Sequence, residues 1–152
     1  MITALLILHG LLAVALLGAI THQAFATSRP AKRHSFIARY RAVAASGYAN
    51  AVVVLFMITS VGGALLYPQY RLDIRPTLED LDLRAANGVF EIKEHLAAIG
   101  LGLLPAYWFF WRQPLGADGL IARRYLTWLL AFIVWWNFLV GHVLNNIRGF
   151  FQ

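Results

Sequence analysis

The sequence has 152 residues, of which 60% are hydrophobic and 13% charged, whereas an ordinary soluble domain is roughly 45–50% apolar. Cysteine is absent, which excludes disulfides, thiolate metal sites and cysteine nucleophiles. The net charge of +6 does not predict nucleic-acid binding, because the basic residues stand in the connections between apolar segments and not on one basic domain.

Four long apolar segments predict an all-α protein, a single-domain integral membrane four-helix transmembrane bundle. A helix needs about 20 apolar residues to cross the hydrocarbon. The segments near that length lie at about 2–25, 49–67, 90–111 and 125–147. They leave little room for a soluble domain.

The first segment carries a histidine near each end, His9 and His22. It resembles a secretory signal, but it lacks a basic n-region and its apolar stretch is long, so we expect a true span. The spacing between the two histidines rotates His22 about 140° away from His9 on an ideal helix. We therefore expect His22 to face head groups or water, which argues against two stacked haems.

The connections between the segments differ in charge. The first, over 27–47, has five basic residues and no acidic one; the third has three arginines against one aspartate; the middle one is balanced. Excess Lys and Arg marks cytoplasmic loops. We therefore expect a multi-pass protein of the bacterial inner membrane with both termini periplasmic. Apolar residues at helical spacing over 36–43 further predict a short helix on the membrane surface.

Proline and glycine divide the middle connection. The second span is expected to end at Tyr67, because Pro68 follows. Near that end, the pair Gly62-Gly63 permits close approach of another helix. Pro76 predicts the start of a short helix that Asn87 and Gly88 stop. The aromatic run over 107–111, which lies late in the third span, is typical of an interfacial belt.

The third span begins with the sequence FEIKEH over 90–95, which places Glu91, Lys93, Glu94 and His95 on the first turns of an apolar helix. Ionisable groups are costly inside a membrane and usually mark function. Glu91 and His95 are four apart and share one helical face. We therefore predict the functional site at this end of the helix.

One interpretation of this end is a haem b site. With the predicted topology, His9, His95 and His142 come from three different helices and fall near the outer membrane face. Two of them would bind the haem iron as neutral imidazoles. Lys93 and Arg71 would neutralise propionates or carboxylates.

A second interpretation is an ion of iron, copper or zinc, for which imidazole and carboxylate are suitable ligands. The order of the third-span residues does not match the Glu-x-x-His motif of di-iron bundles. A third interpretation is that these polar groups only satisfy one another by hydrogen bonds and ion pairs. The candidate metal ligands are His9, Glu91, Glu94, His95 and His142.

Leu8-His9-Gly10, Arg39-Tyr40-Arg41 and Lys93 in the charged start of the third span resemble small four-helix membrane proteins. These include the HemJ-type protoporphyrinogen oxidases and the membrane part of CopD-type copper proteins. The likeness covers the helix layout of the whole chain. It implies that His9 and Lys93 are functional, that a haem is associated, and that an enzyme acting on porphyrin or quinone is a further candidate. The acidic pair and the histidines of the third and fourth spans are not part of that pattern.

The predicted function is electron transfer by a small membrane protein. The alternative is a non-catalytic accessory subunit of a larger respiratory or photosynthetic complex, since the small size and the aromatic-rich fourth segment suit packing against partner helices. The expected partners are the lipid bilayer and other membrane protein subunits, and no nucleic acid.

Overall fold

The computed structural model describes residues 2–28 and 45–149. In that part of the chain every regular element is a helix, which confirms the all-α prediction. The elements in chain order are α1 (Ile2–Ala26), α3 (Ala45–Gln69), the π-helical turn η1 (Tyr70–Ile74), α4 (Arg75–Asp80), α5 (Arg84–Arg112) and α6 (Ala117–Gly149).

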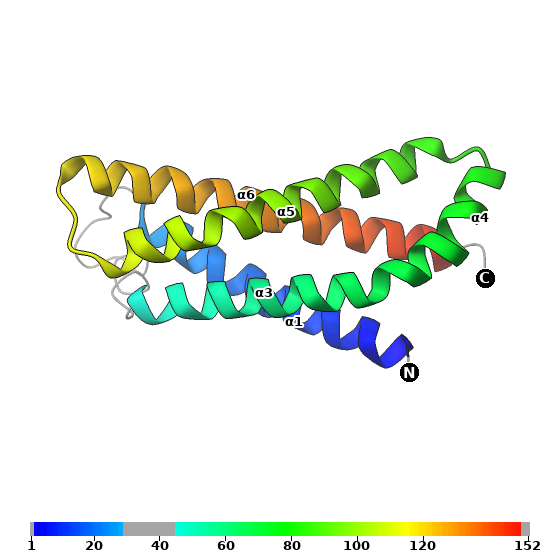
Figure 1. Cartoon of the computed structure of the whole chain (residues 1–152), viewed down its shortest axis with the longest axis horizontal. Helices are drawn as coiled ribbons and strands as arrows, with labels where there is room; N and C mark the ends of the chain where they lie inside the picture. The colour runs from blue at the N-terminus through cyan, green and yellow to red at the C-terminus, as the bar shows by residue number, and fades with distance from the viewer. Residues whose placement is uncertain (1, 29–44, 150–152) are drawn as a thin grey trace.

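The four long helices form a closed ring in which each contacts two neighbours. α1 packs against α3 and α6, and α5 packs against α6 and α3, the last contact being the least extensive. The terminal end of the bundle holds the start of α1, the end of α6, η1 and α4, whereas the opposite end holds the connection between α5 and α6 (Figure 1). This arrangement leaves α3 and α5 least tightly joined near the terminal end.

Three helices are long and apolar enough to cross a membrane, by length and composition: Ile2–Ala26, Gly47–Asp80 and Ala117–Asn146. This confirms the apolar character predicted for three of the four segments. α5 is not among them. Its hydropathy is reduced by the ionisable side chains at its start, by Pro105, and by the tyrosine and tryptophans near its end.

The middle of the bundle is an apolar layer. Phe56 of α3 lies against Gly100 of α5, where an added Cβ would stand 2.4 Å from the Phe56 ring and 3.3 Å from Ile133. Only a glycine permits this close approach. Other buried side chains of the layer are Leu16, Ile20, Val52, Leu104, Leu130 and Val134.

Two predicted helix limits are wrong. Pro68 lies inside α3, which runs to Gln69 and passes directly into η1. Just past the proline, Tyr70 stacks on Phe90 of α5. The predicted stop at Asn87 and Gly88 lies within α5; the reversal before α5 uses Asp82, whose φ of 56° is left-handed.

One further difference concerns a connection. α6 begins at Ala117 and so includes Arg123 and Arg124, which were expected in a loop. The surface helix predicted over 36–43 lies outside the described residues.

Candidate functional site

A groove of about 480 Å³ opens between α3 and α5 at the terminal end of the bundle. This volume falls within the roughly 300–1,000 Å³ of small-molecule sites. Aromatic rings and ionisable side chains share its walls. We call it the outer groove, and its lining residues are Ala64, Tyr67, Tyr70, Arg75, Phe90, Glu91, Glu94 and His95.

Tyr70 fixes one wall of the outer groove. The π-helical turn η1 directs its ring onto Phe90, with ring centroids 3.5 Å apart, and its hydroxyl donates to Oδ1 of Asn87 over 2.8 Å. Burial raises the pKa of Tyr70 to about 12. The phenol therefore stays protonated and remains a hydrogen-bond donor in any ordinary buffer.

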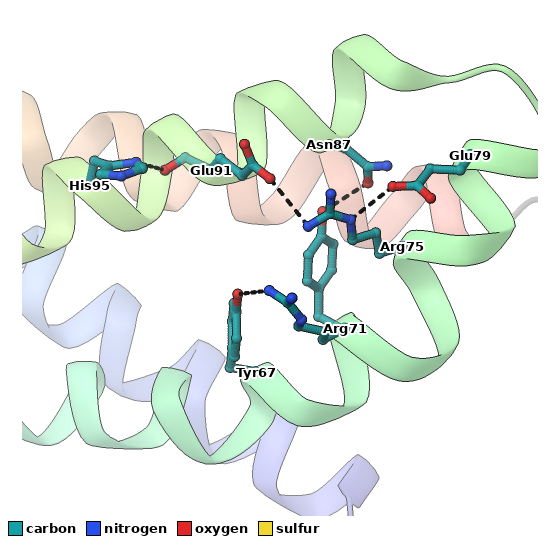
Figure 2. Close-up of polar contacts among 8 residues, drawn as sticks. Tyr67, Arg71, Arg75, Glu79, Asn87, Glu91 and His95 are labelled. Atoms are coloured by element: carbon teal, nitrogen blue, oxygen red, sulfur yellow. Dashed lines mark hydrogen bonds and ion pairs between the residues drawn. The ribbon is translucent and has the colours of Figure 1, made fainter.

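Arg75 stands at the rim of the outer groove between two carboxylates (Figure 2). Its Nε lies 2.8 Å from Glu79, and its Nη1 lies 3.3 Å from Glu91 on the facing helix. The hydrogen bond that Arg75 donates to the Glu79 carboxylate raises the pKa of Arg75. Arg71 donates to the hydroxyl of Tyr67 over 3.3 Å. Two guanidinium groups thus lie near the aromatic wall, Arg75 within the lining of the outer groove and Arg71 beside Tyr67.

His95 lines the outer groove with one ring nitrogen already engaged. Its Nδ1 lies 2.7 Å from the backbone oxygen of Glu91, which can only accept a hydrogen bond. Nδ1 therefore carries the hydrogen, and Nε2 of the neutral ring keeps its lone pair. Metal-binding histidines are commonly oriented by such a bond to a backbone carbonyl.

Lys93 and Glu94 form an ion pair next to the outer groove. The lysine ammonium also lies 4.8 Å from the centroid of the Phe90 ring, a cation–π contact. The Lys93 side chain is only 17% exposed. A charge so enclosed requires a partner, because desolvation of an isolated ammonium is costly.

His9 reaches the same ion pair from α1. Its ring interacts electrostatically with both Lys93 and Glu94. The ring lies against the glycine pair of α3: a Cβ added to Gly62 would stand 3.1 Å from Nδ1, which is itself buried without a partner. The glycine pair thus permits close approach of a side chain, whereas the sequence suggested approach of a helix.

His142 does not join this set. Its side chain is exposed on α6, its Nε2 accepts a hydrogen bond of 3.3 Å from Asn146, and its ring lies parallel to Phe138. Within residues 2–28 and 45–149, no three His, Asp or Glu side chains are placed to hold a metal ion. The candidate ligands therefore divide into a groove set (Glu91, Glu94, His95), a neighbouring buried histidine (His9) and a separate histidine (His142).

The expectation that His22 faces outward is wrong. Its side chain is 3% exposed and stacks on Tyr48 of α3, with ring centroids 4.1 Å apart. The rotation between His9 and His22 places His22 outside only if α1 buries a single stripe along its whole length. Near its end α1 is enclosed by both α3 and α6, so that consecutive residues, His22, Gln23 and Ala24, are all buried.

A second polar layer, which was not predicted from the sequence, lies at the opposite end of the bundle. Gln23, Tyr107 and Thr127 have fully buried side chains, and the indole of Trp111 donates to Thr127 over 3.0 Å. The aromatic run is therefore only partly a belt, since Trp108 is exposed but Tyr107 and Trp111 are not. The signal was present, because Gly100, Leu104, Tyr107 and Trp111 recur at helical spacing on one face.

No family model, curated protein or solved structure matches this chain. The resemblance to HemJ-type and CopD-type proteins therefore stays a prediction.

Proposed function

We propose that this protein is a multi-pass membrane protein that binds haem b in the outer groove and acts in electron transfer. In this proposal it forms a four-span bundle in the bacterial inner membrane, with the terminal end on the periplasmic side.

The membrane placement is supported by three apolar helices and by α5 packing beside them along the bundle. α5 would be the fourth span, with its ionisable first turns at the membrane surface. The opposite end carries the basic connections, which suits the cytoplasmic side. Exposed apolar side chains along α1 and α3, such as Leu11, Val61 and Leu65, would then face lipid.

The observation that carries the haem proposal is the hydrogen bond between His95 Nδ1 and the Glu91 carbonyl. It leaves Nε2 as the available donor atom on a side chain that lines the outer groove. A single proximal histidine is an established way of holding haem iron. Bound haem would supply a reversible one-electron change.

The other groove residues suit the rest of a haem. Tyr67, Tyr70 and Phe90 offer aromatic faces for the apolar macrocycle, and Arg75 offers a guanidinium group for a propionate. Arg71, which bonds to Tyr67 outside the lining, is a second guanidinium nearby. Glu91 and Glu94 would adjust the charge of the site. The sequence suggested two axial histidines, but neither His9 nor His142 lines the outer groove, so the geometry favours ligation through His95 alone.

The test is the optical spectrum of the purified protein, oxidised and reduced, together with its iron, copper and zinc content. We expect Soret and α bands, about one iron per chain, and the spin state of haem with one histidine ligand. A protein that contains no chromophore after purification from haem-supplemented cells and after addition of haemin would contradict the proposal.

A second candidate, an accessory subunit of a larger membrane complex, is favoured by one surface. Large apolar side chains recur every three or four residues along the outside of α6 and are between 41% and 73% exposed. Such a ridge suits packing into the groove of a partner helix. Native electrophoresis of mild detergent extracts tests it, since a subunit co-migrates with larger partners. The ridge consists of Tyr125, Trp128, Phe132, Trp135 and Leu139.

A further inference from the structure

Charge is divided unequally between the two ends of the bundle. Among the described residues, Arg112, Arg123 and Arg124 lie next to the connection between α5 and α6, at the end opposite the termini, and Asp118 is the acidic residue there. The four ion pairs found among the described residues involve Arg75, Arg84 and Lys93, which all lie at the terminal end. None of these ion pairs therefore includes an arginine of the opposite end.

Of the described arginines at this end, Arg123 is partly buried, whereas Arg112 and Arg124 are exposed. The guanidinium carbon of Arg123 lies 5.1 Å from the centroid of the Trp111 ring, and its Nε is buried with no hydrogen-bond partner. Burial of an unpaired guanidinium N–H is unfavourable. The segment 29–44, which connects α1 to α3 at this end, contains no Asp or Glu and so has no carboxylate to offer.

The surroundings of Arg123 are held in place by hydrogen bonds. The Thr127 hydroxyl donates to the Arg123 backbone oxygen over 2.7 Å and accepts the Trp111 indole N–H over 3.0 Å. Trp111 is thereby fixed as a flat support for the guanidinium. A planar guanidinium is suited to bidentate binding of a phosphate.

We infer that the Arg123 guanidinium, supported on Trp111, binds the phosphate of an anionic phospholipid in the leaflet at this end of the bundle. Its position at the start of the apolar helix α6 places it at head-group depth. The lipid would supply the negative charge that this end of the protein lacks. Arg112, whose guanidinium lies 5.8 Å from the Trp108 ring, is a second cation at the same end.

The inference rests on the membrane placement in the proposed function but not on the haem. The lipid inference and the haem proposal can be contradicted independently. Loss of lipid binding would leave the haem spectrum unchanged, and absence of haem would leave lipid binding unchanged. Arg124 provides a matched control, because it is the next residue on the same helix, carries the same charge and is exposed.

The experiment compares wild-type protein with Arg123→Gln and Arg124→Gln. Each is purified in mild detergent and titrated with phosphatidylglycerol, with phosphatidylcholine or with inorganic phosphate, and bound lipid is counted by native mass spectrometry. We expect wild-type protein to prefer phosphatidylglycerol, Arg123→Gln to bind it roughly tenfold more weakly, and Arg124→Gln to bind it normally.

Three results would overturn the inference. They are equal binding of the two phospholipids by wild-type protein, an equal loss in both variants, and saturation of the site by inorganic phosphate alone. If circular dichroism shows that Arg123→Gln does not fold, Arg123→Lys replaces it. That variant keeps the charge but not the planar fork, and we expect weaker phosphatidylglycerol binding; unchanged binding would contradict the role of the guanidinium.

Discussion

Tyr70 and Asn87 are joined by a buried hydrogen bond of 2.8 Å that connects η1 to the first turns of α5. This bond holds Tyr70, one of the residues that line the outer groove. The Nδ2 of Asn87 is buried without a partner, so the Tyr70 hydroxyl is the partner on which the Asn87 side chain depends. The geometry of the groove is therefore sensitive to a single phenol oxygen.

Tyr70→Phe should destabilise the protein by about 1–3 kcal/mol, because it leaves the Asn87 oxygen buried without a partner. Thermal unfolding in detergent, followed by circular dichroism, measures the change. Tyr67→Phe is the control: its hydroxyl bonds only to Arg71 at an exposed position, and we expect a change within about 0.5 kcal/mol. Equal effects of the two substitutions would contradict the assigned burial.

The ionisation of Tyr70 predicts how stability depends on pH. Its pKa is raised from 10.0 to about 12 in the folded protein. The folded chain therefore keeps the proton between pH 10 and 12, where the unfolded chain loses it. The contribution of Tyr70 is fully present below pH 10 and is lost as pH rises through 12. Wild-type protein should thus lose stability over this window relative to Tyr70→Phe, and parallel pH profiles would be the contrary result.

Gly100→Ala should destabilise the middle of the bundle by about 1–3 kcal/mol, since the new methyl group would overlap the Phe56 ring. Gly102→Ala provides the control on the same helix. Nothing lies within 4 Å of its added Cβ, and alanine is the better helix former, so we expect no loss. Unfolding midpoints of both variants check this, and Phe56→Leu in the Gly100→Ala background should restore part of the stability.

Hydropathy and charge predicted much of the fold because membrane helices are defined by length and apolar content. The places of the four long helices and the polar start of α5 followed directly. Helix limits were less predictable: Pro68 looks like a stop, but α3 continues through it to Gln69 and passes into η1.

The candidate site was predictable only in part. Glu91, Glu94 and His95 meet in one groove because they lie on consecutive turns of one helix. His9 and His142 were grouped with them by membrane depth, but depth does not fix rotation about a helix axis. His142 consequently lies apart and bonds to Asn146, and the burial of His22 depended on how tightly α3 and α6 enclose α1.

The most direct test of the account is the haem content of His95→Ala compared with His142→Ala, both purified from haem-replete cells. His95→Ala should lose the Soret band and the bound iron while remaining in the membrane fraction, because it removes the imidazole that lines the outer groove. His142→Ala should keep both, because its ring bonds to Asn146 on the exposed side of α6. Full haem occupancy in His95→Ala would contradict the account.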